Sequence, residues 1–128
     1  MRDFILSVPF FKSKSEDIFA SYFLEHDGDV LIQTLSISND QNQAIGLTIE
    51  EFKELSKIAF NFFENDEEID DPNTAYSWGS GRAKFDYDNS TITLIEESDG
   101  TEVEIYYHSD FFELYDAFKT ITFKESEH

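Results

Sequence analysis

Hydrophobic and polar residues follow two different periods along this chain. An alternation with a period of two predicts β-strands, and a spacing of three or four residues predicts amphipathic helices. Apolar side chains recur at helical spacing over residues 48–63 and 111–121, so two helices are expected there. The predicted strands cover residues 4–10, 18–26, 30–37, 43–47, 82–87, 91–96 and 101–107.

Short polar signals mark where these elements begin and turn. Thr48 and Glu51 match a capping box at the start of the first helix, and Ser109 or Asp110 is the expected N-cap of the second. Turns are predicted at residues 27–28, 88–89 and 98–100, which are rich in Asp, Asn and Gly.

The order of the predicted elements indicates a fold class. Each of two strand meanders is followed by an amphipathic helix. We therefore expect a single α+β domain over residues 1–128, in which the meanders form a curved antiparallel sheet and both helices lie on it.

Composition narrows the class of protein. The chain has 128 residues, of which 40% are hydrophobic and 14 are Phe, which is enough for a folded core. It has no cysteine, which excludes disulfides, thiolate chemistry and Cys-based zinc sites. The apolar run near the N-terminus is too short to cross a membrane and contains a proline. We expect a cytoplasmic protein.

Charge changes the picture most. The formal net charge is −19 and the isoelectric point is near 4.1. Residues 1–63 hold ten acids and five bases, whereas residues 64–128 hold eighteen acids and four bases. A phosphate backbone needs a basic surface, so this balance argues against nucleic-acid binding and favours a cationic protein partner. The alternative is an acidic surface that serves solubility alone.

The acids are densest directly after the first predicted helix. Six carboxylates occur within residues 64–71, next to the negative end of the helix dipole, where each costs a few tenths of a kcal/mol, roughly. Two aromatic residues follow in a loop that reads as exposed, and aromatic side chains often anchor interfaces. The predicted partner-binding residues are Glu64, Asp66, Glu67, Glu68, Asp70, Asp71, Tyr76, Trp78, Glu96, Glu97 and Asp99. The alternative is that Trp78 belongs to the core and the acids form a solvated loop.

No motif predicts catalysis, a cofactor or a metal. His108, Ser109 and Asp110 are adjacent in sequence, and a hydrolytic triad requires a geometry that adjacent residues do not provide. The run at residues 86–90 begins like a calcium loop but lacks the sixth-position Gly, so a hairpin turn is the better interpretation. We expect a protein that is not an enzyme.

The element order resembles, in outline, the Whirly and PUR-repeat single-stranded nucleic-acid binders. In size, acidity, Phe content and absence of cysteine, the chain also resembles bacterial immunity proteins of contact-dependent growth inhibition systems. That second resemblance implies binding and neutralisation of a cognate basic toxin, such as a nuclease. Two alternatives stay open: a phage-type DNA mimic that inhibits a restriction or CRISPR nuclease, and a Whirly-like single-stranded nucleic-acid binder.

Overall fold

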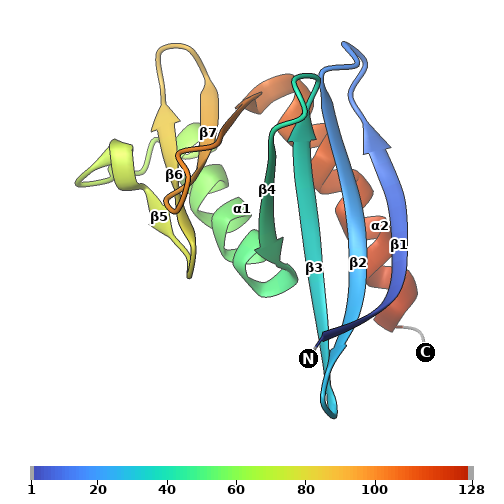
Figure 1. Cartoon of the computed structure of the whole chain (residues 1–128). Helices are drawn as coiled ribbons and strands as arrows, with labels where there is room; N and C mark the ends of the chain where they lie inside the picture. Colours follow the sequence, from blue (N-terminus) through green and yellow to red (C-terminus); the bar gives the residue numbers. More distant parts are fainter. Residues whose placement is uncertain (1, 127–128) are drawn as a thin grey trace.

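The computed structural model describes the backbone of residues 2–126 and the side-chain surroundings of residues 6–121. Two strand meanders alternate with two long helices (Figure 1). The first half comprises β1 (Arg2–Lys12), β2 (Ile18–Asp27), β3 (Val30–Asn39), β4 (Ala44–Thr48) and α1 (Ile49–Glu64). The second half comprises a 3₁₀ turn (Pro72–Thr74), β5 (Tyr76–Ser77), β6 (Gly81–Asp86), β7 (Thr91–Glu96), β8 (Glu102–Tyr106), a π-helical turn (Tyr107–Phe111) and α2 (Phe112–Ser126).

The predicted α+β class is confirmed, and the meanders form one four-stranded antiparallel sheet each. Sheet A has the order β1-β2-β3-β4, and sheet B has the order β5-β6-β7-β8. The two sheets meet where β4 approaches β7 and β8, and α2 lies behind sheet A in Figure 1. The sequence analysis missed β5, because a strand of two residues is too short to show an alternation.

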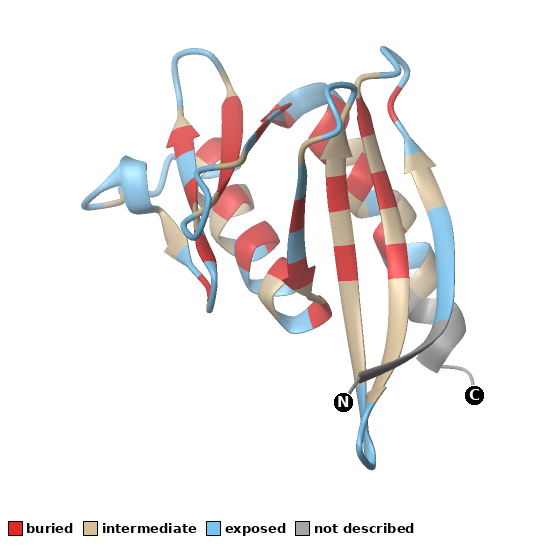
Figure 2. Cartoon of the chain, viewed as in Figure 1, coloured by how far each residue is buried: buried red, intermediate tan, exposed pale blue. Residues whose placement is uncertain are grey.

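A shared apolar interior joins the two sheets to the helices. Its buried side chains include Leu35 and Ile37 of sheet A, Leu94 of sheet B, and Phe52 of α1. Figure 2 shows buried positions alternating along β3, while the 3₁₀ turn and the hairpin tips are exposed. β7 differs, because both of its faces are buried from Thr91 to Ile95. The period-two and helical patterns therefore predicted the buried faces of the other elements, but not the burial of Thr91 and Thr93.

Aromatic rings hold the two helices together. Phe52 of α1 meets Phe118 of α2 edge-on, with ring centroids 4.8 Å apart, and lies 5.8 Å from Phe111. Phe60 of α1 makes an edge-on contact with Tyr115 at 5.1 Å. Such geometries add to the stabilisation that burial provides.

The predicted start of α1 is confirmed. The Thr48 hydroxyl accepts a hydrogen bond from the Glu51 N–H at 3.1 Å, and the Glu51 carboxylate accepts one from the Thr48 N–H at 2.8 Å. This capping box places the Glu51 side chain at the corner between β4 and α1.

The predicted N-cap of the second helix is wrong. Helical backbone begins earlier, in the π-helical turn, so Ser109 and Asp110 lie inside it. Asp110 is only 6% exposed. Burial, followed by the charges of Asp17 and Glu113, raises the pKa of the Asp110 carboxyl above its ordinary value. His108, Ser109 and Asp110 therefore lie within the first helical turn and do not cap it.

Because Asp110 is buried, we predict that Asp110→Asn raises the free energy of unfolding by an amount that depends on pH. Because the folded state raises the pKa of Asp110, wild-type stability falls as the pH rises through that pKa. Asparagine has no charge to desolvate, so the variant should be more stable than wild type at neutral pH. The difference should vanish well below pH 3.8, the ordinary value. Urea unfolding of wild type and variant, at neutral pH and well below pH 3.8, measures this difference in stability. An equal difference at both pH values would contradict the prediction.

Candidate functional site: the acidic edge of sheet B

The acidic segment, residues 64–71, begins where α1 ends. The N–H groups of Asn65 and Glu67 both donate to the Asn61 carbonyl, at 3.3 and 3.0 Å, which ties the segment to the last turn of the helix. Asp66 between them has a φ of +53°, in the left-handed region that Asp tolerates better than most residues. The chain therefore turns sharply away from the helix axis and toward sheet B.

From there the segment follows the outer edge of sheet B alongside β6. Near the β6–β7 turn, the Tyr87 hydroxyl donates to the Asp66 carboxylate at 2.8 Å. At the opposite end of β6, the Arg82 guanidinium donates to the Asn73 carbonyl, and the Ala75 N–H donates to the Ala83 carbonyl at 2.9 Å. These contacts anchor Asp66, near the start of the acidic segment, and Asn73 and Ala75, just after its end, beside a sheet edge that β5 covers for only two residues. Acidic side chains at such an edge also oppose pairing with other strands.

The carboxylates of the acidic segment are exposed and uncompensated. All six are exposed: Glu64, Asp66, Glu67, Glu68, Asp70 and Asp71. Among the residues that the structure describes, none of the six forms an ion pair with Lys or Arg. Asp66 and Asp71 have structural roles, since Asp66 accepts from Tyr87 and Asp71 accepts from the Asn73 N–H at the start of the 3₁₀ turn. The side chains of Glu67, Glu68 and Asp70 make no hydrogen bond or ion pair with another described residue.

Three further predicted residues lie at the end of β7 and in the β7–β8 turn. The Glu96 carboxylate accepts from Ser80 at 3.3 Å, and Glu97 forms an ion pair with Arg82 at 2.9 Å. Asp99 accepts from the Thr101 N–H at 2.9 Å, and this backbone hydrogen bond lowers the pKa of the Asp99 carboxyl.

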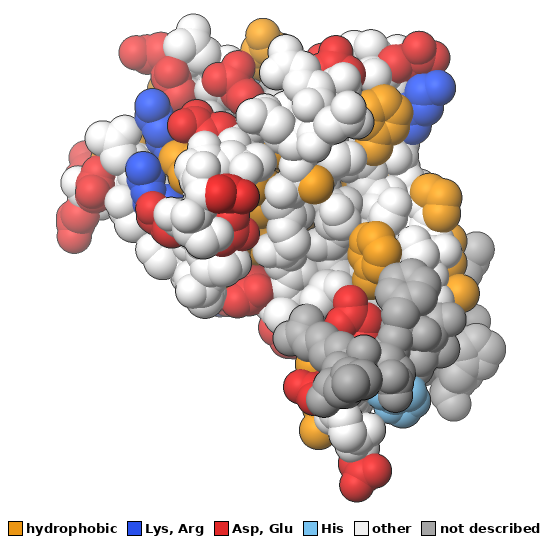
Figure 3. All heavy atoms as spheres, viewed as in Figure 1, with side chains coloured by type: hydrophobic (Ala, Val, Ile, Leu, Met, Phe, Trp, Pro, Cys, Tyr) orange, Lys and Arg blue, Asp and Glu red, His pale blue; other side chains and the backbone are white. Residues whose placement is uncertain are grey.

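Arg82 links the end of the acidic segment to the acidic residues of the β7–β8 turn. Its side chain contacts both Glu97 and the Asn73 carbonyl, so the β7–β8 turn lies beside the end of the acidic segment. The structure thus brings Asp71 and Glu97 to one end of β6, whereas Asp66 lies at the other end. Figure 3 shows Asp and Glu side chains gathered over sheet B around a few basic ones, and few charged side chains over the middle of sheet A.

Trp78 is a correction to the predicted site. Its side chain is only 9% exposed and belongs to the core, so the predicted exposed anchor is wrong and the core alternative holds. The indole lies on the backbone of Gly81, where a Cβ atom would come within 2.8 Å of the ring and 2.2 Å of the Ile95 carbonyl. Tyr76 is half-buried, with its ring centroid 6.2 Å from that of Trp78. Burial and the charges of Glu51 and Glu54 raise the pKa of Tyr76.

The structure exposes two tyrosines in the second half of the chain that the sequence analysis did not select. Tyr87 is 53% exposed and Tyr106 is 54% exposed. Tyr106 follows the buried Ile105, so its outward register in β8 was the signal that could have identified it. Tyr87 lies just after β6, at the parity of the buried Phe85, and no local signal marked it as exposed. Tyr87 contacts Asp66 directly, and the hydrogen bond to this carboxylate raises the pKa of Tyr87.

Within the described part of the chain, no cluster of three or more His, Cys, Asp or Glu side chains is arranged to hold a metal ion. No described helix is both long and apolar enough to cross a membrane. Comparisons with protein-family models, curated proteins and solved structures found no match for this chain.

Proposed function

We propose that this protein is a toxin-neutralising immunity protein that binds a basic protein, such as a nuclease domain, through the acidic edge of sheet B. The observation that carries the proposal is the row of exposed carboxylates in residues 64–71 without described ion pairs. Carboxylates placed where phosphates would bind can occupy the basic cleft of a nuclease.

Electrostatics supports speed as well as affinity. Opposite fields steer two proteins together and raise association rates by about 10- to 1000-fold. An inhibitor must bind its toxin before the toxin acts, so fast association suits this function. Arg82 and Glu97 satisfy one another, and the unpaired carboxylates nearby provide the net attraction.

A DNA mimic is the second candidate, because one observation favours it. A mimic should space its carboxylates along an extended face, as phosphates are spaced along a duplex, whereas an antidote can concentrate them around aromatic anchors. The acidic segment follows a sheet edge and does not surround an exposed tryptophan, which favours the mimic. A mimic would inhibit a restriction or CRISPR nuclease, and duplex DNA would compete with it for that nuclease. Competition by DNA alone does not separate the candidates when the toxin is also a nuclease.

The gene context separates them. We expect the adjacent gene to encode a toxin C-terminal domain, and we expect cells that express this domain to survive only when they also express the present chain. An adjacent set of phage structural genes, with no protection from the neighbouring product, would support the mimic. Saturable binding of labelled single-stranded DNA at low salt would instead support the Whirly-like alternative.

Charge reversal tests the acidic segment as the docking surface. Glu67→Lys with Glu68→Lys should slow association with the toxin domain by about tenfold or more, because both carboxylates lie in the steering field. Neither side chain makes a described hydrogen bond, so the fold should persist.

The matched control is Asp29→Lys with Asp40→Lys, which changes the charge equally at two exposed turns of sheet A. Stopped-flow association should distinguish the two variants. Equal slowing by both pairs would mean that only the net charge matters and that the acidic segment is not the contact.

A further inference from the structure

A hollow lies where the open face of sheet A meets the β5–β6 turn. Its volume is about 420 Å³. Thr34 and Thr48 are directly opposite one another on β3 and β4, and both line it from the sheet. Trp78 and Ser80 line it from the turn, and Glu51 lines it from the first turn of α1. Residues far apart in the sequence therefore converge on one site.

The Glu51 carboxylate is held in place at this hollow. One oxygen accepts from the Thr48 N–H at 2.8 Å, and the other accepts from the Gly79 N–H at 3.3 Å. The Glu96 carboxylate lies beside the hollow, since it accepts from the Ser80 hydroxyl at 3.3 Å. No Lys or Arg is among the described residues that line the hollow. The site therefore presents fixed negative charge together with hydroxyl groups.

Trp78 provides a second, independent observation. Its indole Nε1–H is buried and has no hydrogen-bond partner among the described residues. The indole lies in the wall of the hollow, so its N–H signal reports on the packing there. The indole ring also offers a π face, which attracts cations.

We propose that this hollow takes one arginine or lysine side chain of a cationic protein partner. Glu51 would pair with the charged group, Ile32 would contact the aliphatic stem, and the Thr34, Thr48 and Ser80 hydroxyls would accept the remaining N–H donors. This inference rests on the proposed function for the identity of the partner, and it adds a specific anchor beyond the acidic edge.

The helix dipole does not oppose this assignment. The N-terminus of α1 carries roughly half a positive elementary charge. Glu50 and Glu51 in its first turn carry two negative charges, which exceed the dipole contribution. The corner between β4 and α1 is therefore net negative.

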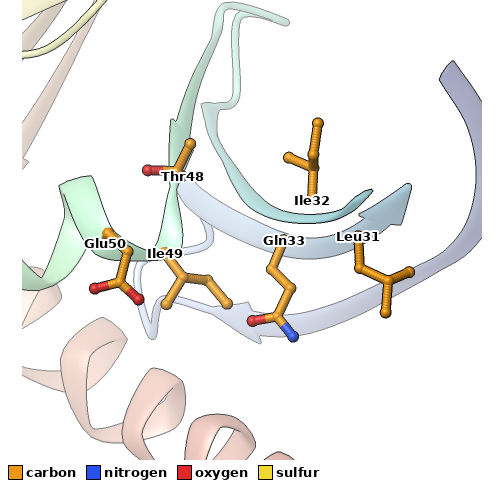
Figure 4. Close-up of a pocket in the computed structure, with 6 residues that line it drawn as sticks. All are labelled: Leu31, Ile32, Gln33, Thr48, Ile49 and Glu50. Atoms are coloured by element: carbon orange, nitrogen blue, oxygen red, sulfur yellow. The ribbon is translucent and has the colours of Figure 1, made fainter. Parts of the chain in front are cut away.

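A neighbouring hollow supplies the matched control. It lies at the same β4–α1 corner and is lined by Leu31, Gln33, Ile49 and Glu50 in addition to Ile32 and Thr48 (Figure 4). Figure 4 shows Leu31 and Gln33 on the side of β3 opposite to Ile32, and Glu50 on their side. Glu50→Gln therefore removes the same charge as Glu51→Gln, one residue away and outside the proposed pocket.

The test uses a small probe and needs no identified partner. Trp78 is the single tryptophan, so its indole N–H gives one NMR signal that reports on the hollow. We expect N-acetyl-arginine amide to shift this signal saturably, and its neutral isostere N-acetyl-citrulline amide to leave it unchanged. Glu51→Gln should weaken the arginine probe by about fivefold or more, since glutamine keeps the capping box but removes the charge. Glu50→Gln should change it by less than about twofold.

A second variant keeps the inference testable if Glu51→Gln fails to fold. Thr34→Phe fills the hollow from the open sheet face without changing any charge, and it should abolish the shift. A signal that never saturates, an equal response to citrulline amide, or an equal loss in both Gln variants would overturn the pocket.

The two proposals fail separately. A saturable arginine response without protection from the neighbouring toxin keeps the pocket and removes the immunity function. If the chain protects cells from the toxin, Glu51→Gln protects equally well, and the arginine probe gives no response, the immunity function stands and the pocket is overturned.

Discussion

Phe52→Ala should lower the free energy of unfolding by about 3–5 kcal/mol, the range for removing a large buried aromatic side chain. Phe52 is 0% exposed and lies between the helices, with its ring 4.8 Å from Phe118 and 5.8 Å from Phe111. The cavity cannot collapse easily, because the capping box fixes the start of α1 and the helix packs against β3 and β4. Urea unfolding followed by far-UV circular dichroism measures the loss.

Lys53→Ala is the control for this prediction. Lys53 is the next residue of α1 and is exposed, so its truncation should change stability by less than about 0.5 kcal/mol. A loss near that small value for Phe52→Ala as well would mean that the interhelical aromatic cluster is not the centre of the core.

Trp78→Ala should lower the free energy of unfolding by about 3 kcal/mol, because the indole closes the core next to the β5–β6 turn. Trp78→Phe should recover most of this loss, since it restores apolar area against Gly81. Circular dichroism is the appropriate readout, as the variants lack the only tryptophan.

The same experiment separates a core residue from an interface anchor. An exposed anchor would leave the unfolding free energy unchanged and would only speed dissociation of the partner. Unchanged stability in Trp78→Ala would therefore contradict the buried position. Within the pocket proposed above, Trp78 has a dual role, because a buried ring can still present one wall to a ligand.

Local patterns predicted most of the secondary structure because they depend on near neighbours. The alternation of Ile92, Leu94 and Ile105 with polar residues located β7 and β8, and the Thr48–Glu51 pair located the start of α1. The exposure of the acidic segment was also predictable from the sequence, since exposed carboxylates need no tertiary partner. The start of the second helix was not predictable in this way, because the burial of Asp110 depends on packing against other elements.

The sequence by itself determined the order of strands and helices, the buried faces and the large negative charge, because periodicity and composition are properties of adjacent residues. Only the tertiary structure decided that the meanders form two sheets, that Trp78 is buried while Tyr87 is exposed, and that Glu51, Thr34 and Ser80 surround one hollow. These features arise from contacts between segments separated by tens of residues. No local pattern encodes such contacts, because the free energy that selects them comes from the packing of the whole chain.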